Sequence, residues 1–177
     1  MRKQSNGKEY NLINKVLVLD RVSKTTDGGR NMSFRCAAVV GDGVSKVGFG
    51  TGKDSEVPIA IQKAMDAATK NMIHVQLKNG TIQHESKTKY GSATVFMKPA
   101  SEGTGVIAGS AMRAIFECLG VRDVLAKCIS SSANALNVAR ATMKALESMK
   151  SPRDIAHLRG ISVNEVLGVE SGEKTDG

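Results

Sequence analysis

The chain has 177 residues, of which 41% are hydrophobic and 24% charged, a composition that argues against wholesale disorder. We expect neither a membrane span nor a secretory signal, because no run approaches roughly 18 apolar residues and no apolar segment follows the basic start. The three cysteines are odd in number and form no C-x-x-C pair. This favours reduced thiols in a cytoplasmic protein over a disulfide framework or a zinc site.

The charge is unevenly distributed along the chain. Residues 1–90 carry 15 basic and 8 acidic side chains, a net charge of +7, whereas residues 91–177 carry 10 and 9, a net charge of +1. We interpret the first half as a face that binds a polyanion. A membrane surface is the competing partner, but no strongly basic amphipathic helix with bulky aromatics is present. Six aromatic residues are too few for stacking on single-stranded bases, which favours folded RNA recognised through phosphates and shape.

Residues 12–53 predict a three-stranded antiparallel meander. The middle strand alternates from residue 31 to 40, and glycine-containing turns fall at residues 27–29 and 41–43. The third strand presents Gly48, Gly50 and Gly52 on one face. A bare face of this kind allows another backbone, of protein or of RNA, to approach closely.

A helix is expected after this meander, with Ser55 as its N-cap and Pro58 in its first turn. Its predicted apolar stripe consists of Val57, Ile61, Ala64, Met65, Ala68 and Met72. The sheet and the helix make a first α+β unit over residues 12–75, the RNA-binding unit. Residues 1–11 are expected to form a flexible arm.

Residues 76–168 predict a second unit with the order β-α-β-α. A hairpin around Asn79-Gly80 and a basic stretch precede a strand at residues 93–97, and a helix runs from about residue 106 to 119. Its small residues Ser110 and Ala111 are expected to pack closely. A strand over residues 121–129 and a helix capped by Asn134 follow. Short helices start at residues 151–152 and at Ser162, and residues 169–177 are expected to be a flexible tail.

Two glycine motifs imitate nucleotide-binding sites. Residues 103–108 fit G-x-G-x-x-A, with Asp123 twenty residues further on, as in a dinucleotide fingerprint. Asp123 precedes the apolar run of its strand, however, which favours a tight loop with small residues over a cofactor site. Residues 48–53 fail the Walker A pattern at Val47 and Asp54, although Lys53 and nearby amides remain candidates for holding a backbone phosphate. A small nucleotide-dependent enzyme stays an alternative.

The remaining residue patterns predict no catalytic residues, no metal and no cofactor, because the three histidines are scattered and no nucleophile motif appears. The first hairpin is the strongest candidate site. Arg21, Lys24 and Arg30 flank its glycine turn, and such a hairpin suits insertion into an RNA groove or junction. The predicted RNA-binding residues are Arg21, Ser23, Lys24, Thr25, Gly28, Gly29, Arg30, Arg35, Lys46, Lys53, Lys87 and Lys89.

Several short motifs follow one another as they do in the bacterial ribosomal S-five family, which the chain resembles over residues 11–168. They are Arg21-Val22-Ser23-Lys24-Thr25, Gly28-Gly29-Arg30, Val39-Val40-Gly41-Asp42-Gly43, Val47-Gly48-Phe49-Gly50, Gly52-Lys53, Glu56-Val57-Pro58, Ile61-Gln62-Lys63-Ala64, Pro99-Ala100-Ser101-Glu102-Gly103-Thr104-Gly105 and Ala111-Met112-Arg113-Ala114. Each motif alone is weak, but their order and spacing are specific. Asp27 departs from the family pattern by placing an acid in a loop that is usually basic or neutral.

The resemblance implies an N-terminal domain similar to double-stranded-RNA-binding domains and a C-terminal β-α-β-α domain. It also implies binding to small-subunit ribosomal RNA near the body–head junction and contacts with small-subunit proteins four and eight. Messenger RNA would enter beside Arg21 and Arg30, and residues 23–25 would lie near the spectinomycin pocket. Gly105 and Arg113 would contact protein four, where the family influences decoding accuracy. The resemblance further implies that the chain is not an enzyme and has no small-molecule substrate. A general RNA chaperone is the other alternative.

Overall fold

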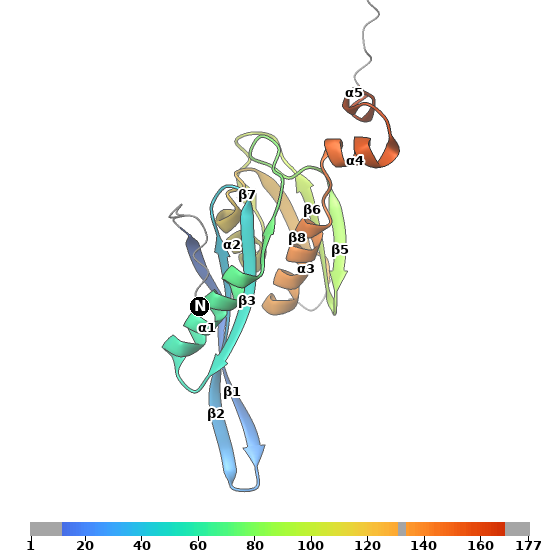
Figure 1. Cartoon of the computed structure of the whole chain (residues 1–177). Helices are drawn as coiled ribbons and strands as arrows, with labels where there is room; N and C mark the ends of the chain where they lie inside the picture. The colour runs from blue at the N-terminus through green and yellow to red at the C-terminus, as the bar shows by residue number, and fades with distance from the viewer. Residues whose placement is uncertain (1–11, 131–133, 169–177) are drawn as a thin grey trace, which may run out of the picture.

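The computed structural model describes residues 12–130 and 134–168, so the arm at residues 1–11 and the tail at residues 169–177 lie outside the described residues. The chain is an α+β protein, as predicted (Figure 1). The first part contains β1 (Ile13–Thr26), β2 (Gly29–Gly41), β3 (Lys46–Asp54), α1 (Val57–Lys70) and β4 (Met72–His74). The second contains β5 (Ser86–Tyr90), β6 (Ala93–Pro99), β7 (Val106–Ile107), α2 (Ser110–Leu119), β8 (Val124–Cys128), α3 (Ala135–Glu147), α4 (Pro152–Arg159) and α5 (Val163–Val166).

The first sheet is antiparallel in the order β1-β2-β3-β4. The three predicted strands are confirmed, and Thr26 pairs with Gly29 across a two-residue turn. The fourth strand, β4, is a correction to the three-stranded prediction. Its three residues pair with residues 46–48 of β3. A strand of this length is too short to show an alternating pattern, which explains why the sequence did not indicate it.

The bare face of β3 packs against helix α1, so protein backbone, not RNA, makes the close approach. The backbones meet pairwise, Gly48 with Ala68, Gly50 with Ala64 and Gly52 with Ala60, where an added Cβ would lie 2.0, 2.2 and 2.3 Å from the alanine carbonyl oxygen. The buried stripe of α1 therefore consists of alanines spaced four residues apart. The predicted stripe was wrong in omitting Ala60 and in including Met72, which lies on β4.

The second sheet has the order β5-β6-β8-β7, and β7 is parallel to β8. Two predicted boundaries are corrected here. Residues 106–107 pair with β8 instead of starting a helix, so α2 begins at Ser110. Strand β8 begins at Val124 and not at residue 121, because the amides of Arg122 and Asp123 donate to the Gly80 carbonyl oxygen.

In the second part, the helix caps were predicted more accurately than the ends of the strands. Asn134 caps α3, and Ser151 and Ser162 form the capping boxes of α4 and α5. The turn at Asn79-Gly80 exists, but it closes a single bridge and not a hairpin. The hairpin joins β5 to β6 instead. Ser110 is exposed, so its predicted packing role is wrong, whereas Ala111 is buried as expected.

One hydrophobic core runs through both parts of the molecule. Val39 and Val47 of the first sheet belong to the same buried cluster as Ile115, Phe116 and Ala139 of α2 and α3. The backbones are equally close, because a Cβ added to Gly41 would lie 2.1 Å from the Cys118 carbonyl oxygen. The inner half of β2 is therefore covered on both faces, by α1 on one side and by α2 on the other. The boundary between residues 75 and 76 stays a prediction.

Candidate nucleic-acid interface

The outer half of the β1–β2 hairpin projects beyond the rest of the molecule (Figure 1). Residues 23–32 are all exposed, and Arg21 is exposed as well. In the observed register Thr25 pairs with Arg30, and Lys24 pairs with Asn31. Paired residues lie on the same face of a sheet and successive residues alternate, so Arg21 and Arg30 share one face and Lys24 lies on the other. The hairpin thus presents cations on both sides.

The other predicted RNA-binding cations are spread over the molecule. Arg35 lies on β2 on the same face as Lys24, and its direct partner across β2 and β3 is Lys53. Lys46 is exposed at the opposite end of β3, beside His74 of β4, so it does not join the hairpin. Lys87 and Lys89 are exposed on β5 in the second sheet. The structure therefore assembles only part of the predicted set into one surface.

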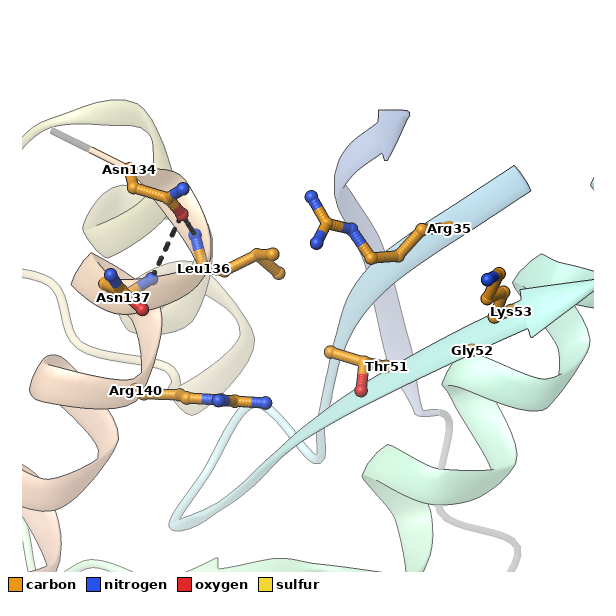
Figure 2. Close-up of a pocket in the computed structure, with 8 residues that line it drawn as sticks. All are labelled: Arg35, Thr51, Gly52, Lys53, Asn134, Leu136, Asn137 and Arg140. Atoms are coloured by element: carbon orange, nitrogen blue, oxygen red, sulfur yellow. Dashed lines mark hydrogen bonds between the residues drawn. The ribbon is translucent and has the colours of Figure 1, made fainter. Parts of the chain in front are cut away.

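A pocket of about 350 Å³ brings Arg35 and Lys53 together with residues that were not predicted to bind RNA (Figure 2). Its far side is the start of α3, from which Arg140 extends toward the strands. Arg140 is almost 90 residues from Lys53 along the chain, which is why no local pattern indicated it. The lining residues are Arg35, Thr51, Gly52, Lys53, Asn134, Leu136, Asn137 and Arg140.

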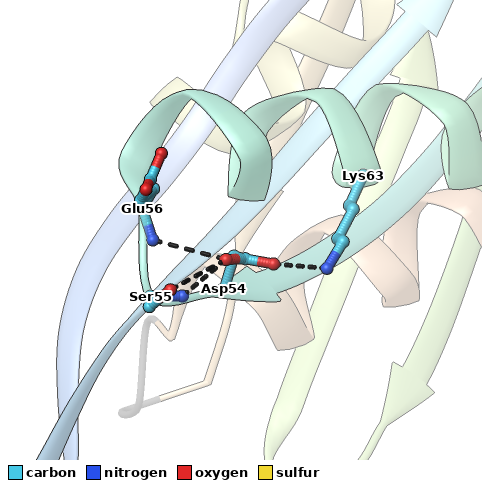
Figure 3. Close-up of polar contacts among 4 residues, drawn as sticks. All are labelled: Asp54, Ser55, Glu56 and Lys63. Atoms are coloured by element: carbon cyan, nitrogen blue, oxygen red, sulfur yellow. Dashed lines mark hydrogen bonds and ion pairs between the residues drawn. The ribbon is translucent and has the colours of Figure 1, made fainter.

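In the candidate phosphate loop, the carboxylate of Asp54 takes the place that a phosphate would have (Figure 3). Asp54 accepts hydrogen bonds from the Ser55 amide at 2.8 Å and the Glu56 amide at 3.4 Å, and it pairs with Lys63. The ion pair with Lys63 is the main cause that lowers the pKa of Asp54 to about 2. The Ser55 and Glu56 amides are therefore not free to bind a phosphate. The N-cap of α1 is Glu56 and not Ser55, since the Glu56 carbonyl oxygen accepts from the Ala60 amide.

The outer face of the second sheet is a second basic surface. Cross-strand register places Lys87 and Lys89 of β5 on the same face as Phe96 of β6 and Lys127 of β8. A pocket of about 290 Å³ on this face is lined by Phe96, Lys98, Ile107, Leu125, Ala126 and Lys127. The predicted pair Lys87 and Lys89 therefore belongs to a larger lysine-rimmed apolar face, from which Lys98 and Lys127 had been missed.

The dinucleotide-like motif is explained by loop structure. The Gly105 amide donates to the Asp123 carboxylate at 2.8 Å, and the Val124 amide donates to the Gly105 carbonyl oxygen at 3.1 Å. Asp123 is buried, and Gly105 has a positive φ of 75° that disfavours other residues. The acid that would bind a ribose in the fingerprint instead holds this loop against β8.

Arg113 is exposed on α2, as expected of an interface residue, but it is not solitary. Its Nε donates to Glu117 at 3.0 Å, and Glu117 also pairs with Lys15 of β1. Lys15 and then Arg113 lower the pKa of Glu117. Gly105 has open space where a Cβ would stand.

The cysteine thiols belong to the packing of the molecule. Cys36 and Cys118 are buried, and Cys128 is partly buried. Burial raises the pKa of Cys118 to about 11, which keeps this thiol protonated. Over residues 12–130 and 134–168, no three His, Cys, Asp or Glu side chains gather as metal ligands would. Within the same residues, no helix has the length and apolar character to cross a membrane.

Comparison with known proteins identifies the chain. The family model for the N-terminal domain of ribosomal protein S5 matches residues 12–76, and that for its C-terminal domain matches residues 88–159. The small ribosomal subunit protein uS5 of Pseudoalteromonas translucida is 53% identical over 165 residues, which cover 93% of this chain and 98% of that protein. The uS5 protein of Hahella chejuensis is 55% identical over 165 residues, covering 93% and 97%. That of Chromohalobacter salexigens is 55% identical over 157 residues, covering 89% and 94%.

These matches define the class as that of ribosomal structural proteins, which are not enzymes. Within this class, the chain belongs to the ribosomal protein S5 family of the small subunit. The resemblance drawn from the order of the short motifs is thereby confirmed, and with it the non-enzymatic character of the chain. The alternative of a nucleotide-dependent enzyme, which rested on the glycine motif at residues 103–108, is therefore not supported.

Proposed function

We propose that the chain is a structural constituent of the small ribosomal subunit that binds small-subunit ribosomal RNA through the outer half of the β1–β2 hairpin. The observation that carries this proposal is the projection of the hairpin with exposed cations on both faces, Arg21 and Arg30 on one and Lys24 on the other. A narrow two-stranded ribbon with this charge suits a groove or junction of folded RNA, where phosphates lie on both sides.

The finer assignments belong to the same proposal. Residues 12–75 act as the RNA-binding unit, and residues 76–168 form the second domain, whose Gly105 and Arg113 contact small-subunit protein four. Protein eight is the other partner among the small-subunit proteins. Two observations support the contact with protein four: Arg113 is exposed in the first half of α2, and there is open space beside Gly105 in the loop before β7. The basic hairpin would also line the channel through which messenger RNA enters. In the cytoplasm the protein would thus contribute to subunit assembly and to translational accuracy.

The proposal is tested by replacing Lys24 and Arg30 with Ala and measuring binding to small-subunit ribosomal RNA over a range of salt concentrations. Each lost phosphate contact lowers the log–log salt slope by about 0.7 to 0.9 units. The double variant should bind more weakly with a shallower slope, whereas Lys70→Ala, at the last turn of α1, should behave as the unmodified protein.

Two outcomes would contradict the proposal. An unchanged slope in the double variant would remove the hairpin from the interface. Equal competition by an unrelated structured RNA would identify a general RNA chaperone instead of a ribosomal component.

A further inference from the structure

The pocket between β2, β3 and α3 collects positive charge from distant parts of the chain. Arg35 and Lys53 are direct cross-strand partners in β2 and β3, an arrangement in which like charges repel. Arg140 extends from α3 into the same space (Figure 2). None of the residues that line the pocket is acidic. The fold therefore holds three cations around one cavity.

Only Arg35 among these three cations has an acidic partner in the described part of the chain, so two of the positive charges are not compensated. Asp20 accepts from one terminal nitrogen of Arg35 at 2.9 Å, and Asp54, next to Lys53, pairs with Lys63. Among the described residues no carboxylate pairs with Lys53 or Arg140. A bound anion would relieve the repulsion that the sheet register imposes.

Arg140 is held in position by a residue of the second sheet. Its Nη1 donates to the Tyr90 hydroxyl at 3.4 Å, and its guanidinium carbon lies 5.7 Å from the centroid of the Tyr90 ring. The free amides at the N-terminus of α3 already have an acceptor, since the Asn134 side chain accepts from the amides of Leu136 and Asn137. The guanidinium groups, and not the helix amides, are thus the donors available to an anion. Arginine has the geometry that phosphate recognition favours.

We propose that this pocket binds one phosphate group of the RNA backbone, so that both parts of the molecule hold the RNA. The inference rests on the proposed function and extends it to α3. Arg35 and Lys24 share one face of the same hairpin, four register positions apart, which corresponds to roughly 13 Å along a strand. An RNA strand that follows this face from the hairpin tip reaches the pocket next. This continuity favours backbone phosphate over a free phosphate ion.

The experiment compares Arg140→Gln with Lys144→Gln in the full chain. Both residues are exposed on α3, but only Arg140 lines the pocket. Arg140→Gln should lower the salt slope of ribosomal RNA binding by about 0.7 to 0.9 units, and Lys144→Gln should leave it unchanged. Thermal melting verifies folding. If Arg140→Gln lowers the melting temperature, Lys53→Gln on β3 tests the same pocket and should lower the salt slope in the same way. Arg140→Lys, which keeps the charge, should restore the slope.

The outcomes separate this inference from the proposed function. If the Lys24 and Arg30 variant flattens the slope while Arg140→Gln and Lys53→Gln do not, the hairpin stands and the pocket proposal is overturned. If Arg140→Gln flattens the slope and the hairpin variant does not, the pocket stands and the hairpin proposal fails. Titration with inorganic phosphate alone is the third arm. Saturable binding that Arg140→Gln abolishes, with an unchanged RNA slope, would mean a free-anion site and would also overturn the proposal.

Discussion

Strand β2 has two halves with opposite environments. Residues 36–41 are buried, between α1 on one face and α2 on the other, whereas residues 29–32 are exposed at the projecting end of the hairpin. The pairing with β1 extends from the hairpin turn to Ile13 and Gly41, with one register shift between Val16 and Val18. The core half therefore anchors the exposed half. Changes in the first should affect stability and changes in the second should affect binding.

The largest expected effect is on stability, from Gly50→Ala on the strand that pairs with the inner half of β2. The new Cβ would lie 2.2 Å from the Ala64 carbonyl oxygen, an atom of helix backbone that cannot rotate away. We expect a loss of about 3 kcal/mol or more in the free energy of unfolding, at the upper end of overpacking effects. Urea denaturation measures it.

The matched control for this glycine is Gly28→Ala in the hairpin turn. Nothing lies within 4 Å of a Cβ at that position, and its φ is not in the left-handed region. The free energy of unfolding should change by less than about 0.5 kcal/mol. Similar losses in both variants would mean that the hairpin turn contributes as much to the free energy of unfolding as the packed part of the sheet.

A second comparison lies on α2, which covers the inner half of β2. Ala111 is buried in the common core, whereas the preceding Ser110 is exposed. Ala111→Leu should lower the free energy of unfolding by about 1–3 kcal/mol through overpacking. Ser110→Leu should leave it nearly unchanged, and a large loss from Ser110→Leu would show that this end of α2 is covered.

The sequence predicted the fold class, the hairpin and most helix ends because these depend on local residues. Capping side chains act within a few residues, so Asn134 and Ser162 were identified correctly. β4 and β7 are too short to carry a periodic signal and exist only because a longer strand lies beside them. Arg140 joins Arg35 and Lys53 only after the two parts pack together, which no local pattern encodes.

The ion cluster around Glu117 ties β1 to α2 and predicts a pH effect. Lys15 and Arg113 lower the pKa of Glu117 below its ordinary value of 4.5 in the folded protein. The pairing therefore stabilises the fold above the unfolded pKa, and this contribution is lost as the pH falls through the lowered folded pKa. Since Glu117 is about a third exposed, Glu117→Gln should cost less than about 1 kcal/mol at neutral pH.

The measurement is the difference in unfolding free energy between the unmodified protein and Glu117→Gln as a function of pH. The difference should be constant near neutral pH and should shrink below pH 4.5. A difference that grows on acidification would contradict the predicted sign.

The smallest expected effect on stability comes from Arg113→Leu. This variant tests whether Arg113, the exposed member of the ion cluster, contacts protein four. Glu117 keeps its pair with Lys15 in this variant, so only an exposed helical ion pair is lost, worth about 0.2 to 0.5 kcal/mol. Folding and ribosomal RNA binding should therefore persist. If Arg113 contacts protein four, its loss should raise miscoding in a reporter translation assay, while Arg113→Lys, which retains the charge, should raise it less. Normal accuracy with full incorporation into small subunits would argue against this contact, and a general loss of assembly would show that Arg113 is needed for structure instead.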